Sequence, residues 1–321
     1  MSGKIKILTI GKATQDVYLQ SDEFDPHTEG KIAYTHLPLG VKMDVDKVTF
    51  ASGGNATNVA VTFARQGIDT SYMWPLGFDP ASKVVLHDLN TEGVSTSHVA
   101  QKDRYQAGYS TILIATNGER TILNYHGVFT DSHGTDLDFS AIEKVDWVYP
   151  TSVGGIELLG KIVDHAKKSD TKVMLNPAGS ELAEPEKLKA LLKNVDILCV
   201  NKEEMQGLVH GETAEELVRN GLRLVPVVIV SDGPNGVAAS DGKTIVKAGM
   251  YEDVKVTDRN GAGDAFASGF LSQWVQGKSL AASIVFASAN STSVVQVIGA
   301  KPGILRKGVT LHNMPLEEHN V

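Results

Sequence analysis

The chain has 321 residues, enough for one large α/β domain or two smaller ones. Its 30 Lys and Arg residues against 38 Asp and Glu residues give a formal net charge of −8, so the composition predicts neither a nucleic-acid partner nor an anionic membrane partner. The single cysteine, Cys199, excludes an internal disulfide and a cysteine-rich zinc site. The first apolar run, residues 5–10, is too short for a signal peptide or a membrane span, which predicts a cytoplasmic protein.

The N-terminal part of the chain predicts strands. Residues 5–10 form a compact β-rich run, and Gly11 ends it in a turn that leads to Asp16. Polar side chains beyond a strand end often gather around ligands in open α/β sheets, so Asp16 is a candidate binding residue. Residues 21–50 alternate in a way typical of short, partly exposed strands, which indicates a small β excursion from a main sheet.

The stretch GGNATNVAVTFARQG, residues 53–67, predicts a helix that begins directly after two glycines. Its apolar residues recur at helical spacing, and Gly67 is placed to end the helix. Gly53 and Gly54 permit close approach of a ligand, whose hydroxyls Asn55 or Asn58 could bind. The alternative is that Asn55 only caps the helix.

The next segments add a strand at 71–76, a helix at 81–92 and a hairpin. Residues 107–115 and 121–125 flank Asn117-Gly118, a strong hairpin signal between β-rich runs. We assign this hairpin to the same small β layer as residues 21–50.

From residue 145 the chain alternates between strands and helices, which predicts βαβ units and a mostly parallel sheet with helices on both faces. The expected strands are 145–149, 172–175, 195–200 and 225–230, and the expected helices are 155–168, 184–193 and 203–221. A hairpin around Asp241-Gly242 and a helix at 279–296 follow. The polar residues that come just after the strands are Asn176, Asn201, Glu204, Ser231 and Asp232. We expect them to line one edge of the sheet.

The stretch DRNGAGDAFASGF, residues 258–270, predicts an anion site at a helix start. Gly261, Ala262 and Gly263 should lie just ahead of the helix, where a glycine turn and the helix's unpaired N–H groups attract an anion. Asp264 would then stand beside the anion, which suits a base that takes a proton from a hydroxyl attacking a phosphoryl group. The alternative is that Asp264 caps the helix.

Further motifs occur in an order that resembles the ribokinase-like (PfkB) carbohydrate and nucleoside kinase family. Besides the two glycine-led helix starts, they are GFD at 77–79, GVSTSHV at 93–99, GERT at 118–121, NPA at 176–178, NKEE at 201–204, SDGPNG at 231–236 and IGAKPG at 298–303. The resemblance covers nearly the whole chain. It implies a three-layer α/β/α domain with a mostly parallel central sheet and a small β-sheet lid.

The resemblance also implies the domain boundaries and the reaction. The large domain would comprise residues 1–14, 51–104 and 128–321, and the lid residues 15–50 and 105–127. The implied activity is transfer of the ATP γ-phosphoryl group to a primary hydroxyl of a small sugar that is ribose-, fructose- or ketodeoxygluconate-like. Asp264 would be the general base, and the amides of Gly261, Ala262 and Gly263 would stabilise the transferring group.

The other implied roles follow the same motifs. The acceptor-site residues would be Asp16, Gly53, Gly54, Asn55 and Asn58. The ATP contacts would be Asn201, Ser231, Gly233, Gly236 and Asn290. Glu204 would organise Mg²⁺ through water, although the bare sequence favours a surface helix start at Asn201. Asp258 would be an oxygen ligand for a monovalent cation such as K⁺.

Some points stay open in the sequence. Arg259 stands where the family usually has Thr, and its guanidinium could contact the phosphates or point to solvent. A nucleoside acceptor would need an apolar or aromatic shelf, for which Tyr34, Tyr105, Tyr109 and Phe129 are candidates. A non-catalytic sugar- or nucleotide-binding regulator is the alternative of another class. A homodimer could form through the strands of the lid.

Overall fold

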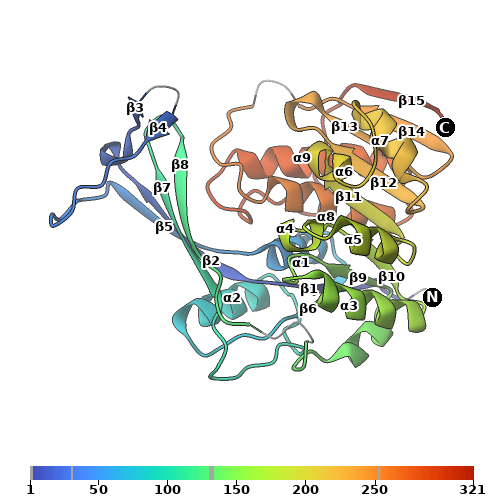
Figure 1. Cartoon of the computed structure of the whole chain (residues 1–321), viewed down its shortest axis with the longest axis horizontal. Coiled ribbons are helices and arrows are strands. Elements are labelled where there is room, and N and C mark those ends of the chain that lie inside the picture. The colour runs from blue at the N-terminus through green and yellow to red at the C-terminus, as the bar shows by residue number, and fades with distance from the viewer. Residues whose placement is uncertain (1–2, 30–31, 130–133, 252–253) are drawn as a thin grey trace.

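The computed structural model describes residues 3–29, 32–129, 134–251 and 254–321, and it contains a large helix-covered sheet and a smaller sheet that projects from it (Figure 1). In this described part the large sheet has nine strands in the order β15-β14-β13-β12-β11-β10-β9-β1-β6. Their bounds are β1 Lys6–Ile10, β6 Asp69–Met73, β9 Trp147–Pro150, β10 Lys172–Leu175, β11 Ile197–Asn201, β12 Val227–Ser231, β13 Val237–Ser240, β14 Thr244–Ala248 and β15 Leu316–Asn320. The six strands from β6 to β12 pair in parallel, and the last three add an antiparallel edge.

Both faces of the large sheet are buried, because successive side chains along each strand enter different hydrophobic clusters. On β11, Ile197 and Cys199 pack in one cluster, while Leu198 and Val200 pack in the other. Helices α3 (Ile156–Lys168), α5 (Pro185–Leu192) and α7 (Ala214–Gly221) contribute to the cluster of Leu198. Helices α8 (Ala262–Trp274) and α9 (Leu280–Val295) form the opposite layer, and α1 (Asn55–Arg65) packs against α8. The expected three-layer α/β/α architecture is therefore correct.

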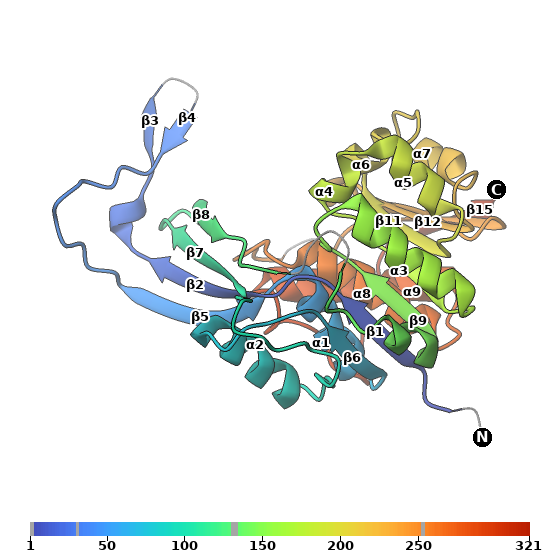
Figure 2. The ribbon, with the colours of Figure 1, turned by 60° about the horizontal axis from the view of Figure 1, so that its bottom comes forward.

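The smaller sheet, here called the lid, has the strand order β5-β2-β7-β8. Its strands are β2 Thr14–Gln20, β5 Lys47–Gly53, β7 Gly108–Ile114 and β8 Arg120–Tyr125. Between β2 and β5 the chain makes a hairpin of β3 (His27–Glu29) and β4 (Ile32–Tyr34), which stands at the far end of the lid in Figure 2. Strand β1 continues into β2 after three residues, and β5 leads directly into α1, so the lid joins the large domain close to these helix and strand ends.

Residues paired directly across strands share one face of the lid. Asp16, Ser110 and Asn124 form one such row across β2, β7 and β8. The next row contains Tyr18, Ile112 and Ile122, and the row after that contains Gln20, Ile114 and Arg120, with Lys47 on the opposite edge strand.

Three sequence expectations need correction. Asp16 lies within strand β2 and not in a turn beyond β1. The helix expected at 203–221 is two helices, α6 (Lys202–Gln206) and α7, because Gly207 ends the first and Thr213 caps the second. The C-terminal strand β15 was not expected.

Helix α2 (Pro80–Thr91) and α9 match the expected bounds within one residue. None of the described helices combines the length and the apolar character that a membrane crossing requires.

Candidate active site

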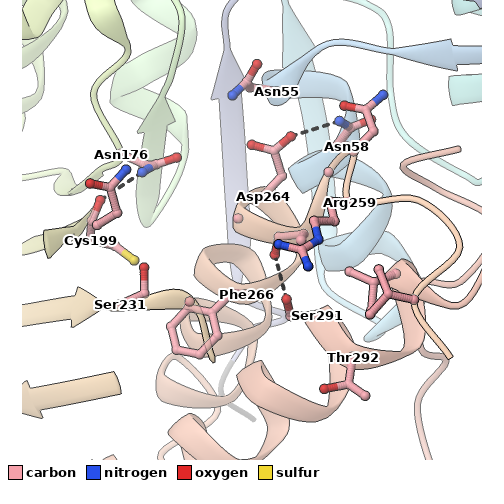
Figure 3. A pocket seen from close by; sticks show the side chains of 18 of the residues that line it. Asn55, Asn58, Asn176, Cys199, Ser231, Arg259, Asp264, Phe266, Ser291 and Thr292 are labelled. Carbon is pink, nitrogen blue, oxygen red and sulfur yellow. Dashed lines mark hydrogen bonds between the residues drawn. The ribbon is translucent and has the colours of Figure 1, made fainter. Parts of the chain in front are cut away.

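One cleft of about 730 Å³ lies between the lid and the large domain and brings most of the predicted site residues together. The predicted residues that line it are Asp16, Gly54, Asn55, Asn58, Asn201, Glu204, Ser231, Gly233, Gly236, Gly261, Ala262, Gly263 and Asp264. In Figure 3 the Asp264 carboxylate points toward Asn55 and Asn58, whereas Ser231 and Thr292 lie toward the other end of the view. The cleft therefore joins residues from both glycine-led helix starts and from the sheet edge.

The turn before α8 has the geometry of an anion site. Helix α8 begins at Ala262, and its N-cap Gly261 adopts a left-handed conformation with φ 76°. A Cβ at Gly261 would lie 2.4 Å from the Cβ of Ala300, so glycine is required here both for backbone freedom and for space. The N–H groups at this helix start have no partner within the helix, and the helix dipole adds positive potential.

Asp264 lies in the first turn of α8 and is only 7% exposed. Burial raises the pKa of its carboxyl to about 6, although hydrogen bonds from Asn58 and Asn55 act in the opposite direction. Asn58 Nδ2 donates to Asp264 Oδ2 at 2.8 Å. The other amide atom of Asn58, Oδ1, is buried without a hydrogen-bond partner among the described residues, although the side chain lines the cleft.

The first lid row places a second buried carboxylate, that of Asp16, in the same cleft as Asp264. Asp16 is 4% exposed, and burial raises its pKa, opposed by hydrogen bonds from Ser110 and Thr14. Gly53 does not line the cleft, but a Cβ there would lie 2.1 Å from Asp16 Oδ2. Gly53 is therefore needed to leave room for the Asp16 side chain.

The two residues expected at the metal-organising motif form a capping box at the start of α6. Asn201 Oδ1 accepts from Glu204 N at 2.9 Å, and Glu204 Oε2 accepts from Asn201 N at 2.9 Å. The helix-start interpretation of this motif is thus correct. Both side chains also line the cleft, so Asn201 Nδ2 and the second oxygen of Glu204 could meet a ligand. Burial raises the pKa of Glu204.

The prediction that Asn290 contacts the nucleotide is wrong. Its side chain is fully buried, with Nδ2 donating to Ala265 O at 2.7 Å and Oδ1 accepting from Leu305 N at 2.8 Å. Asn290 therefore ties α9 to α8. Its helix neighbours Ser291 and Thr292 line the cleft in its place.

The expected role of Asp258 as a cation ligand is not supported by its surroundings. Asp258 is 2% exposed, and Arg120 Nη1 lies 3.2 Å from its Oδ1. The same oxygen accepts from Asn260 N at 3.0 Å, and Oδ2 accepts from Gly299 N at 3.1 Å. Protein donors therefore reach both carboxylate oxygens, and a guanidinium already supplies positive charge.

None of the four aromatic residues considered as a shelf for a nucleoside is among the described residues that line the cleft. Tyr105 is buried against Asp136, Tyr109 lies on the outer face of the lid, and Phe129 packs near Trp74. Tyr34 belongs to the distant hairpin strand β4.

Sequence reasoning did not identify the cleft-facing residues of the lid hairpin. They are Ser110, Ile112, Arg120, Ile122 and Asn124. The alternation of β7 and β8 carries this signal, because residues two apart share a face. This alternation identifies the cleft-facing residues only when the pairing of Ser110 with Asp16 is known. Arg259, whose direction was open, lines the cleft.

Comparisons with known proteins agree with this architecture. The ribokinase of Haemophilus influenzae is 28% identical over 81% of this chain and 86% of its own length. The structure of Arabidopsis thaliana ribokinase complexed with ribose and ATP matches with a TM-score of 0.75 and 23% identity, covering 94% of this chain and 95% of that one. The adenosine kinase of Sinorhizobium meliloti matches with a TM-score of 0.76 and 21% identity, covering 94% and 96%. These structural matches show the shared fold.

The sequence pattern of one family spans most of the chain. It is described as pfkB family carbohydrate kinase and matches residues 4–306. Both glycine-led helix starts and the whole lid fall within this range. The protein belongs to the pfkB family of carbohydrate kinases, phosphotransferases with an alcohol group as acceptor.

Proposed function

We propose that the protein transfers the γ-phosphoryl group of Mg-ATP to a primary hydroxyl of a small sugar that is ribose-, fructose- or ketodeoxygluconate-like. One observation carries the proposal: the buried Asp264, with a pKa near 6, directly follows the anion-binding turn and faces the polar row of the lid across one cleft. The cleft thereby combines the three parts that phosphoryl transfer to an alcohol needs: a base, a site for the transferring phosphoryl group and groups that bind hydroxyls.

The proposed mechanism assigns each side of the cleft a task. Asp16, Asn55 and Asn58 hold the acceptor hydroxyls, because all three line the cleft beside Asp264. Asp264 takes the proton of the attacking hydroxyl, for which a pKa near 6 is suitable because the group is ionised at pH 7 yet still basic. The amides of Gly261 to Gly263 stabilise the charge on the transferring group, and the lid excludes water.

The ATP side of the cleft is assigned to Asn201, Ser231, Gly233 and Gly236, with Arg259 near the phosphates. Glu204 is the residue that would hold Mg²⁺, through water, because only one of its oxygens is used in the capping box. When bound with ATP, Mg²⁺ neutralises charge on the phosphates.

We propose that the reaction needs no bound potassium ion, because Arg120 supplies the positive charge next to Asp258. Equal rates in potassium chloride and in tetramethylammonium chloride are expected. A strong dependence on potassium would contradict this part of the proposal.

The kinase assignment is tested by an ADP-release assay with a panel of pentoses, hexoses, sugar acids and nucleosides. Asp264→Asn should still bind ATP in a calorimetric titration but should lower transfer by at least about 10³-fold, as expected for loss of the base together with its alignment. Transfer near the parental rate in the variant would refute the assignment. Stabilisation by a sugar and by ATP without ADP release from the parental protein would instead support a non-catalytic regulator.

A nucleoside acceptor is the second candidate, favoured by one specific observation. Ile112 and Ile122 line the cleft in the lid row next to Asp16, and Ile122 is 47% exposed. This apolar row could pack against a base while the polar row binds the ribose. In the acceptor panel, Ile122→Asn should weaken a nucleoside more than a free pentose. An equal effect on both acceptors would argue against this candidate.

A further inference from the structure

The segment that precedes the anion-binding turn is held at several points. Thr257 N and Asp258 N donate to Val295 O at the end of α9, at 2.7 and 3.1 Å. The Asp258 side chain accepts from Asn260 N and from Gly299 N, which shapes the chain just before Gly261. Asp258 is therefore the residue that fixes the chain before the turn, and we call it the junction.

Two contacts join this junction to the lid. Arg120, on the edge strand β8, places Nη1 at 3.2 Å from Asp258 Oδ1. Tyr18, on β2, accepts a hydrogen bond at its hydroxyl from Asn260 Nδ2 at 2.9 Å. Both residues lie on the same face of the lid as Asp16. Tyr18 belongs to the row next to that of Asp16, and Arg120 belongs to the row after it.

Because Asp258 is buried and Arg120 is not, loss of the ion pair disturbs Asp258 more than Arg120. The carboxylate is 2% exposed, so few water molecules can replace a lost charge partner, whereas the Arg120 side chain is 29% exposed and lines the cleft. A buried carboxylate that loses its cation must find another partner or move. Motion of the lid edge therefore changes the surroundings of Asp258 and, through Asn260, the turn at Gly261.

We propose that Arg120 is a positioning residue, which couples the placement of the lid over the acceptor to the placement of the anion-binding amides. The lid contacts of Arg120 and Tyr18 hold residues 258–260, and these residues set where the amides of 261–263 point. Where it concerns the reaction rate, this inference rests on the proposed kinase function. It goes beyond that function by assigning a positioning role to a residue on the edge strand of the lid.

Three variants test the coupling. Arg120→Gln removes the charge, and Tyr18→Phe removes the hydroxyl that accepts from Asn260 while keeping the ring. Lys47→Gln is the matched control, because Lys47 is a lid residue of the same row on the opposite edge strand. Arg120→Lys asks whether a positive charge alone restores function.

Hydrogen exchange of the peptide covering residues 258–264 is the primary measurement. We expect about tenfold faster exchange in Arg120→Gln and a smaller increase in Tyr18→Phe, with no change in Lys47→Gln, because local opening follows loss of specific contacts. Unchanged exchange in both test variants would overturn the coupling. The same increase in the control would also overturn it, since a general effect of lid charge would then suffice.

Steady-state kinetics provide the second measurement. Arg120→Gln should lower kcat by about 10- to 100-fold with little change in ATP affinity, because misplaced amides affect the transition state. Arg120→Lys should recover part of this loss. A lower kcat with unchanged exchange would overturn the positioning role in favour of direct contact with the phosphates. The exchange experiment needs no substrate, so failure of the parental protein to transfer a phosphoryl group would refute the kinase function separately.

Discussion

Asp264 should destabilise the folded protein at neutral pH, and Asp264→Asn should reveal by how much. Burial raises the pKa of Asp264 from 3.8 to about 6, a difference of about two units. Each unit corresponds to about 1.4 kcal/mol, so keeping the carboxylate ionised in its folded site costs about 3 kcal/mol. Because the folded pKa is raised, this cost is absent below about pH 4 and reaches its full size above about pH 6.

The assay is urea unfolding of the parental protein and the variant at several pH values between 4 and 8. The free energy of unfolding of Asp264→Asn minus that of the parental protein should increase by about 2.4 kcal/mol over this range, because a small part of the cost is already present at pH 4. Altered hydrogen bonds to Asn55 and Asn58 add a constant that cancels in the pH comparison. Asp164→Asn, at an exposed position of α3, supplies the baseline. A difference that does not change with pH would refute the desolvation argument.

The remaining predictions concern the cleft. Asn58→Ala removes a hydrogen bond that lowers the pKa of Asp264, so the acid limb of kcat/KM, expected near pH 6, should move to higher pH; an unmoved limb would contradict this. Gly53→Ala places a Cβ 2.1 Å from Asp16 Oδ2 and should raise the acceptor KM by more than about tenfold, with ATP affinity unchanged by calorimetry. Burial raises the pKa of Cys199, so thiol reagents at pH 8 should modify it slowly until denaturant is added.

The features that the sequence predicts well depend on local signals. The helix starts at Asn55 and Ala262 follow from glycines placed directly before apolar residues at helical spacing. The hairpin at Asn117-Gly118 and the βαβ alternation are equally local. Most residues chosen for the cleft lie at such helix starts or strand ends, which explains why the structure brings them together.

The errors occur where distant segments decide the outcome. Strand β2 exists because β5 and β7 pair with it, and neither is near it in the chain. The local sequence therefore places Asp16 just beyond the end of β1 and gives no sign of a second strand. Helix α9 carries apolar or small residues on every face, and its periodicity could not show that Asn290 faces α8. The ion pair between Arg120 and Asp258 joins a lid hairpin to the phosphate turn, a contact without any local signal.

The lid row of Asp16, Ser110 and Asn124 has a consequence for how this enzyme could change over evolution. Two of these three positions, Ser110 and Asn124, lie in a hairpin that contributes no part of the large sheet. Side chains there can be exchanged without disturbing the hydrophobic clusters of the large domain or the base on α8. New acceptors could therefore be tried by substitution in one hairpin. A directed library restricted to Ser110, Ile112, Ile122 and Asn124, with Arg120 kept, would explore acceptor choice while the phosphoryl-transfer apparatus stays intact.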